Sequence, residues 1–336
     1  MINLTRLYCD VAQPMDHLRY GRGHGSPTSA AERRPIVVWN ITRRCNLKCV
    51  HCYQDSDSKF YPGELSWEQC QAVVDDLADY KVPALLLSGG EPTIHPKFFE
   101  LAEYATGKGL RLTLSTNGTL INPEWAQRIK DIGFSYVGIS LDGMGATHDH
   151  FRGKVGAFDK AVAAFRNCKA VGQKVGLRLT LSRHNIADIE GILDFIERED
   201  IERVCFYHLV YSGRGSELME VPHEETRGAI DKILDRTAQW AASGKPREVL
   251  TVDQPVDGPY LYMRLKRENP ERAARAMELM NWNGGGANSS GTGISNIDTQ
   301  GNVHPDQFWH ELTLGNVKER KFSDIWSNRD NATLNA

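Results

Sequence analysis

The sequence predicts an α/β fold, namely a partial barrel of six parallel strands, each followed by a helix, with a small C-terminal α+β extension. Three observations predict it. Short apolar runs alternate with longer amphipathic segments between residues 36 and 222. Consecutive strand–helix units favour parallel pairing through right-handed crossovers. Finally, polar motifs follow directly on the apolar runs, at the strand ends where such folds gather their functional groups.

Short apolar runs and helix signals define the elements in order. The predicted strands are Ile36–Thr42, Ala84–Ser88, Arg111–Ser115, Tyr136–Leu141, Val175–Leu181 and Arg203–Leu209. The predicted helices between and after them are Ser66–Lys81, Pro96–Gly107, Pro123–Ile132, Ala157–Gly172 and Asn185–Glu199. Ser66 and Gln69 form a capping-box start, and Gly107 and Gly172 occupy expected C-cap positions.

Both flanks of the barrel differ from it in pattern. Residues 1–35 are expected to be a partly flexible N-terminal leader, because residues 21–29 are rich in turn-forming residues. Residues 36–222 are the expected barrel core, and residues 223–336 the C-terminal extension. The extension is predicted to contain helices over Glu224–Ala242 and Asp257–Leu279, followed by a glycine-rich stretch. A β-hairpin turning at Thr299–Asn302 comes next.

Composition excludes several classes of protein. The 40 basic and 43 acidic residues give a net charge of −3, so nucleic acid is not an expected partner. No stretch is apolar enough to predict a membrane span, and the first residues lack the order of a signal peptide. Seven cysteines, odd in number and mostly unpatterned, argue against a disulfide framework and for a reducing compartment. The expected location is the cytoplasm.

The most informative motif is the trio Cys45, Cys49 and Cys52, directly after the first predicted strand. Three thiolates from one loop can each hold one iron of a 4Fe–4S cluster, which leaves the fourth iron open to a ligand. A zinc site is the alternative, but a structural zinc needs four ligands and only His51 is nearby. Buried thiols without a metal are the other alternative. The remaining cysteines, Cys9, Cys70, Cys168 and Cys205, share no spacing.

This CxxxCxxC spacing resembles the signature of the radical S-adenosylmethionine (SAM) enzymes. The resemblance implies a TIM-type radical SAM barrel in which SAM chelates the open iron of a 4Fe–4S cluster. It also implies that the reduced cluster passes one electron to SAM, which yields a 5′-deoxyadenosyl radical that abstracts hydrogen from the substrate. A low-potential donor of the flavodoxin or ferredoxin type would supply the electron.

Four later motifs end predicted strands or follow them closely and are candidates for SAM contacts. Glu91 of the Gly-Gly-Glu motif resembles the group that accepts from the SAM ammonium, and Arg152 suits the methionine carboxylate because a guanidinium binds it bidentately. Serine and carboxylate groups at the next strand ends suit the ribose. The alternative is that these tips only close turns, as Asn117 would before Gly118. The expected contacts are Tyr53, Ser88, Gly89, Gly90, Glu91, Ser115, Asn117, Ser140, Asp142 and Arg152.

More narrowly, the chain resembles the NirJ-type haem d1 biosynthesis proteins. The matching runs are residues 38–53, 149–153, 206–210 with 212–215, and 301–309 with 314–317. The resemblance implies removal of propionate side chains from 12,18-didecarboxysirohaem, a tetrapyrrole. Such a substrate needs cations, for which Arg178, Arg183, His208 and Arg214 are candidates, with aromatic walls from Tyr207 and Tyr211. His208 and His304 are candidates to bind its iron. The alternatives are solvated loop charges and ordinary packing.

Two departures from this family keep other functions open. The places where peptide-modifying relatives carry cysteines for an auxiliary cluster read Asn288–Gly291 and Pro305–Asp306 here. NirJ-type proteins also continue into a cysteine-rich tail, whereas here no cysteine follows Cys205. We therefore expect a truncated C-terminal region of the SPASM type. The alternative functions are removal of acetate groups from the same tetrapyrrole, peptide modification, and a non-catalytic tetrapyrrole carrier or iron–sulfur scaffold.

Overall fold

A single curved sheet organises the molecule. The computed structural model describes residues 1–336 except residues 15, 17–19, 21–33, 283–288, 329 and 331–336. The strands of the described part are β1 (Ile2–Asn3), β2 (Ile36–Asn40), β3 (Leu85–Ser88), β4 (Leu112–Thr116), β5 (Tyr136–Ser140), β6 (Val175–Leu181), β7 (Arg203–His208), β8 (Glu248–Val252), β9 (Ile294–Ile297), β10 (Asn302–His304) and β11 (Gly315–Asn316). Their order is β1-β8-β7-β6-β5-β4-β3-β2-β9-β10-β11.

The strands from β2 to β8 run parallel, each beside the next in the chain. β9 continues the sheet parallel to β2, and β10 pairs with it antiparallel. The outermost strands β1 and β11 pair with their inner neighbours and not with each other, so the barrel is partial. Parallel strands place their carboxyl ends at one edge, where a shared site can form.

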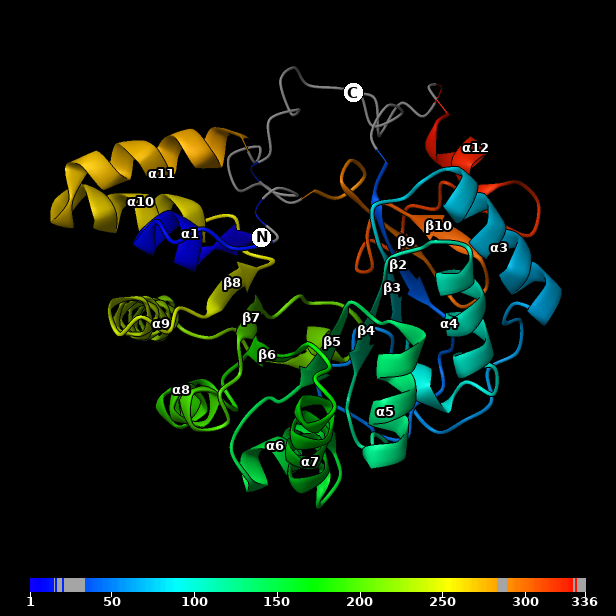
Figure 1. The fold of residues 1–336 in the computed structure, drawn as a ribbon, viewed down its shortest axis with the longest axis horizontal. Coiled ribbons are helices and arrows are strands. Elements are labelled where there is room, and N and C mark those ends of the chain that lie inside the picture. The colour runs from blue at the N-terminus through cyan, green and yellow to red at the C-terminus, as the bar shows by residue number, and fades with distance from the viewer. Residues whose placement is uncertain (15, 17–19, 21–33, 283–288, 329, 331–336) are drawn as a thin grey trace.

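Helices cover the outside of this sheet (Figure 1). They are α1 (Leu4–Cys9), α3 (Trp67–Asp79), α4 (Phe98–Gly107), α5 (Pro123–Ile132), α6 (Ala146–Arg152), α7 (Ala157–Ala170), α8 (Ile189–Arg198), α9 (His223–Ala242), α10 (Asp257–Glu268), α11 (Pro270–Trp282) and α12 (Phe322–Trp326). Between the helices and the strands lies a core whose aliphatic and aromatic side chains are almost fully buried. Burial of this apolar surface is the main term that holds the layers together.

All six predicted strands are confirmed, with ends shifted by at most two residues. The capping box that begins α3 is also confirmed, because the Gln69 main-chain N–H donates to Ser66 Oγ over 3.3 Å and the Ser66 N–H donates to Gln69 Oε1 over 2.9 Å. The predicted hairpin forms as β9 and β10. The sheet does not stop at the predicted boundaries, however: β1 from the leader and β8 and β9 from the extension pair directly with each other or with barrel strands.

Two local predictions are wrong. The helix predicted over Asp257–Leu279 is two helices, because Pro270 has no N–H to donate and holds Asn269 in an extended conformation (φ −154°). The predicted cap at Gly107 is still helical, and the left-handed residue after α4 is Gly109 (φ 82°). Gly172 does adopt the left-handed conformation, directly after α7 (φ 67°).

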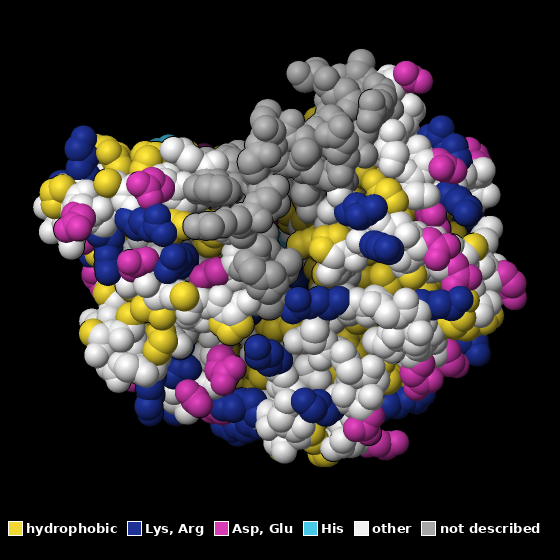
Figure 2. Space-filling view, turned by 45° about the horizontal axis from the view of Figure 1, so that its top comes forward, with side chains coloured by type: hydrophobic (Ala, Val, Ile, Leu, Met, Phe, Trp, Pro, Cys, Tyr) yellow, Lys and Arg dark blue, Asp and Glu magenta, His cyan; other side chains and the backbone are white. Residues whose placement is uncertain are grey.

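The surface carries both signs of charge. Over the face drawn in colour in Figure 2, basic and acidic side chains are interspersed. No helix in the described part of the chain has the length and apolar character needed to span a membrane. All seven cysteines are free thiols, with Cys70 and Cys168 in α3 and α7 and Cys205 in β7, as the sequence predicts.

Candidate functional site

A pocket opens at the carboxyl ends of the parallel strands. Its lining contains most residues that the sequence singles out: Cys45, Cys49, Cys52, Tyr53, Ser88, Gly89, Gly90, Ser115, Asn117, Ser140, Asp142, Arg152, Arg178, His208 and Arg214. Glu91 and Arg183 are not among the lining residues. The tertiary structure therefore brings the cysteine loop and the strand-end motifs into one cavity.

Each thiol of the cysteine loop accepts at least one hydrogen bond. Cys45 Sγ accepts from the Leu47 main-chain N–H (3.4 Å) and from Asn117 Nδ2 (3.9 Å). Cys49 Sγ accepts from Arg152 Nη1 (3.6 Å), and Cys52 Sγ accepts from the Ser56 N–H (3.3 Å). Hydrogen bonds to the ligand sulfurs are among the features that tune iron–sulfur clusters.

These thiols suit a cluster better than a single metal ion. No group of three or more His, Cys, Asp or Glu side chains in the described ranges is arranged to hold one ion, which argues against the zinc alternative. A cluster needs no such convergence, because each thiolate binds a different iron. Burial raises the pKa of Cys45 to about 12, with Glu91 and Cys49 adding to the effect. The bare thiol is thus protonated, and metal binding must release that proton.

The two glycines of the Gly-Gly-Glu motif are required by the cysteine loop. A Cβ on Gly89 would lie 2.4 Å from the Thr42 carbonyl oxygen, and one on Gly90 would lie 2.2 Å from that of Arg44. Gly90 N–H donates to the Thr42 carbonyl over 2.7 Å. We expected these glycines to admit a ligand to the backbone. They line the pocket, but what approaches their Cα atoms is the loop that carries the cysteines.

Glu91, which the sequence analysis expects to accept from the SAM ammonium, is hydrogen-bonded within the protein in this structure. Its carboxylate is fully buried and accepts from Thr93 N–H (3.1 Å) and Oγ1 (2.6 Å), from Thr116 Oγ1 (2.7 Å) and from Asn117 N–H (2.7 Å). Three of these donors bond to Oε1, whereas Oε2 accepts only the Asn117 N–H. In this structure, Glu91 therefore ties the end of β3 to the end of β4.

Arg152 is engaged within the protein as well. It forms a buried ion pair with Asp142, whose other oxygen accepts the Thr180 N–H over 2.7 Å. The expected partner was the methionine carboxylate of SAM, but α6 brings the guanidinium between Asp142 and Cys49. Its Nε is buried and has no hydrogen-bond partner among the residues that the structure describes, so the side chain keeps one donor available.

Serine hydroxyls at successive strand ends remain available. Ser115 at the end of β4 and Ser140 at the end of β5 line the pocket, and among the described residues neither side-chain hydroxyl has a hydrogen-bond partner. Asn117, in contrast, closes an Asx turn by accepting the Thr119 N–H over 2.9 Å, which is the alternative that the sequence left open. Of these polar tips, the two serines best fit a ribose.

Arg178, which lies on β6 and lines the pocket, suits an anionic ligand. The Arg178 guanidinium lies over the Tyr207 ring, 4.9 Å from its centroid, and has no carboxylate within ion-pair distance in the described part of the chain. His208 Nε2 bonds to Asp257 Oδ2 over 2.9 Å. His304 does not line the pocket, and its ring nitrogens contact the Leu312 carbonyl and Asp298, so it is not placed to bind a substrate's iron.

Three further expectations about the pocket mouth need correction. Arg183 is exposed and donates to the Glu220 carbonyl over 2.6 Å, because the loop after β6 turns it away from the cavity. Tyr211 is half exposed and does not line the pocket. Arg214 lines the pocket, but its guanidinium bonds to the cysteine loop.

Asp253, Gln307 and Phe308 also line the pocket, although no sequence motif identified them. Asp253 follows β8, and burial raises its pKa to about 6, while its Oδ2 has no hydrogen-bond partner. The β-branched run Val249–Val252 could have revealed this strand and the carboxylate at its end. Gln307 and Phe308 follow the hairpin, and nothing local to the sequence places them in the barrel mouth.

Comparison with known proteins agrees with this geometry. Residues 39–196 match the family model of the radical SAM superfamily. The chain is 51% identical to the Fe-coproporphyrin III synthase of Methanosarcina barkeri, over 97% of this chain and 83% of that protein. It is 43% identical to the pre-heme d1 synthase of Dinoroseobacter shibae, over 88% and 74% respectively. Streptococcus suis SuiB bound to SAM shares the fold (TM-score 0.69, 15% identity, 88% and 66% covered).

Proposed function

Because the chain belongs to the radical SAM superfamily, whose cofactors are a 4Fe–4S cluster and SAM, we propose that it removes carboxylate side chains from an iron tetrapyrrole. The relatives at 51% and 43% identity are both named for tetrapyrrole synthesis, and each aligns with most of this chain. The observation that carries the proposal in the structure is Arg178, which lines the same cavity as the cysteine loop and has no carboxylate partner among the described residues.

Between the two side-chain chemistries, the relatives favour acetate removal. From the sequence we expected removal of propionates on the path to haem d1, with acetate removal as the alternative. The relative named for Fe-coproporphyrin III is more similar than the one named for pre-heme d1. Coproporphyrin keeps its propionates, so a didecarboxysirohaem would have to lose acetates to become it. Removal of propionates remains the second candidate, because the pre-heme d1 synthase also covers 88% of this chain.

The residues present fit this cofactor pair. Cys45, Cys49 and Cys52 would hold three irons of the cluster, and Ser115 and Ser140 would meet the ribose of SAM. When bound, the cofactors supply the means to abstract a hydrogen atom from an unactivated carbon. The protein itself positions the reacting groups. The cysteine loop, the two serines and Arg178 line one pocket, where they would hold the cofactors and the substrate together.

Arg178 would bind a carboxylate of the macrocycle and so orient it. Guanidinium groups bind carboxylates bidentately, and this one is stacked on Tyr207, which limits its rotation. Because the site is recessed, removing one partner of the charge pair is expected to cost about 2–5 kcal/mol of substrate binding.

Anaerobic reconstitution tests the proposal. The chain is loaded with iron and sulfide, reduced, and mixed with SAM and 12,18-didecarboxysirohaem, and the tetrapyrrole products are identified by mass spectrometry. Loss of acetates supports the first candidate, and loss of propionates supports the second. SAM cleavage with an unchanged tetrapyrrole would refute both and favour peptide modification. Tetrapyrrole binding without SAM cleavage would favour a carrier.

An arginine variant tests the substrate residue separately. Arg178→Gln should weaken tetrapyrrole binding at least about tenfold, in line with the loss of a desolvated charge pair, and leave the iron content unchanged. Arg166→Gln, which removes an exposed arginine of α7 that pairs with Glu199, is the control. Equal tetrapyrrole affinity in both variants would remove Arg178 from the substrate site.

A further inference from the structure

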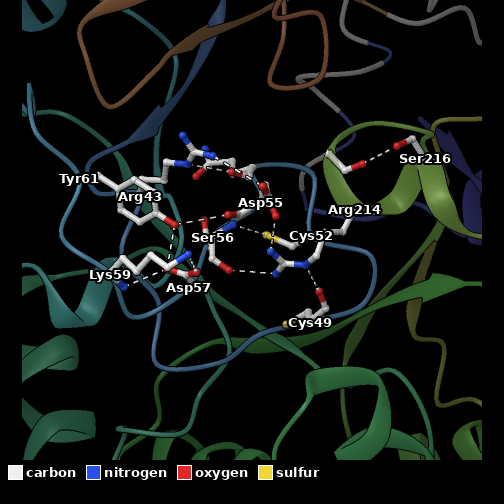
Figure 3. Close-up of polar contacts among 12 residues, drawn as sticks. Arg43, Cys49, Cys52, Asp55, Ser56, Asp57, Lys59, Tyr61, Arg214 and Ser216 are labelled. Carbon is white, nitrogen blue, oxygen red and sulfur yellow. Dashed lines mark hydrogen bonds and ion pairs between the residues drawn. The ribbon is translucent and has the colours of Figure 1, made fainter.

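Arg214 makes a set of contacts that serves the cysteine loop and not the open pocket (Figure 3). Its Nε donates to the Cys49 carbonyl over 2.8 Å, and its Nη2 donates to the Ser56 carbonyl over 2.9 Å. Nη1 pairs with Asp55 Oδ1 at 2.5 Å. One guanidinium thus spans the loop from the middle cysteine to a point four residues beyond the last one.

The main chain at this position reinforces the side chain. The Arg214 N–H donates to the Cys52 carbonyl over 3.0 Å. The preceding residue, Gly213, adopts φ +54°, and a Cβ there would lie 2.4 Å from the same carbonyl oxygen. Only glycine permits this close approach without displacing the loop. The turn after β7 is therefore shaped to touch the backbone on which two of the three cysteines sit.

The positive charge of Arg214 is balanced by a neighbouring carboxylate. Asp55, itself largely exposed, neutralises it, and the Arg214 side chain is only 15% exposed. Backbone carbonyls in a loop are otherwise solvated by water or by neighbouring N–H groups. The rigid, planar guanidinium of arginine can donate to several backbone carbonyls at once, whereas the single flexible ammonium group of a lysine cannot.

We propose that Arg214 is a positioning residue of the cluster loop: it holds residues 49–56 in the conformation that presents Cys49 and Cys52 to the cluster. The inference rests on membership of the radical SAM superfamily and is independent of the tetrapyrrole substrate. Arg214 also follows Leu209 and Val210, which line the pocket, so the same turn joins the pocket wall to the cysteine loop.

Three variants and one control test this role. Arg214→Gln removes the positive charge and most of the hydrogen-bond donors. Arg214→Lys keeps the positive charge but not the planar set of donors. Asp55→Asn removes the counter-charge while leaving the carbonyl contacts intact. Arg166→Gln removes an exposed arginine that pairs with Glu199 and is the matched control. Each apo chain is compared by amide hydrogen exchange over residues 45–56 and over β6. Each reconstituted chain is compared by iron content and by the rate at which a chelator removes the iron.

A positioning role predicts a local effect. Both Arg214 variants should speed exchange in residues 45–56 and iron loss by at least about tenfold, because charge-assisted hydrogen bonds are lost, while β6 exchanges as in the parent chain. Asp55→Asn should have a smaller effect, and the control none. Parent-like exchange and iron retention in Arg214→Lys would refute the proposal, as would equal acceleration in β6, which would indicate general destabilisation. If Arg214→Gln fails to fold, the lysine variant decides.

Discussion

The buried pair of Arg152 and Asp142 allows a sharp prediction about the site's framework. The side chains are 9% and 1% exposed, and they join α6 to the end of β5 beneath the cysteine loop. We consider Arg152→Met, Asp142→Asn and the double variant. Methionine keeps an unbranched stem without charge, and asparagine keeps an oxygen for the Thr180 N–H that Asp142 now accepts over 2.7 Å.

The magnitude follows from burial. An exposed pair would contribute less than about 1 kcal/mol, but breaking a buried pair strands one charge and costs about 3–5 kcal/mol. Each single variant should therefore lose that amount of unfolding free energy. The double variant strands no charge, so it should be more stable than either single variant, and the coupling energy should then exceed the larger single-variant loss of about 3–5 kcal/mol.

Urea unfolding of the apo chain under reducing conditions measures these free energies, with the slope of each transition compared between variants. Single-variant losses below about 1 kcal/mol that add up in the double variant would refute the reasoning. That result would mean that Arg152 is effectively solvated in the apo protein and remains available for the SAM carboxylate that the sequence suggested.

Three further outcomes are expected. Cys49→Ala should abolish cluster binding in an iron assay, whereas Cys168→Ala, in the helical core, should retain it; the reverse result would overturn the cluster assignment. Glu91→Gln should destabilise the apo chain by about 1–3 kcal/mol in urea, because an amide cannot accept at both positions; a parent-like midpoint with weaker SAM binding would restore the role expected from sequence. Burial alone would lower the pKa of His304, but Asp298 outweighs it and raises that pKa. Its stabilising effect should thus be full below about pH 6.5 and lost at higher pH, and a midpoint gap from His304→Gln that stays constant with pH would contradict this.

Much of the fold could be predicted from local pattern. The six barrel strands carry their own signal, since short runs of buried aliphatic residues such as Val175–Leu181 are bounded by turn residues and helix caps. The outer strands β8 and β9 were not predicted as members of the barrel sheet. Their pairing joins residues far apart in the chain, and no local pattern specifies a long-range partner.

The candidate site, too, could be predicted from the sequence only in part. The spacing of Cys45, Cys49 and Cys52 indicated a 4Fe–4S cluster with one open iron, and its resemblance to the radical SAM signature implied that SAM binds there. Their relation to the strand-end motifs followed from the rule that parallel strands share a carboxyl edge. The roles of the charged residues did not follow, because a side chain's role depends on which partner the fold brings within hydrogen-bond distance.

Only the tertiary structure showed that Glu91 and Arg152 bond within the protein and that Arg214 donates to the cysteine loop. It also showed that Arg178 lines the pocket without a carboxylate partner in the described part of the chain. All four are charged residues, and local sequence pattern does not show which of them the fold pairs with a partner. Desolvation separates them: inside the protein a charge must be matched by nearby partners, and those partners come from segments distant in the chain. The sequence determined which chemistry gathers at this edge, and packing determined which charges remain available for it.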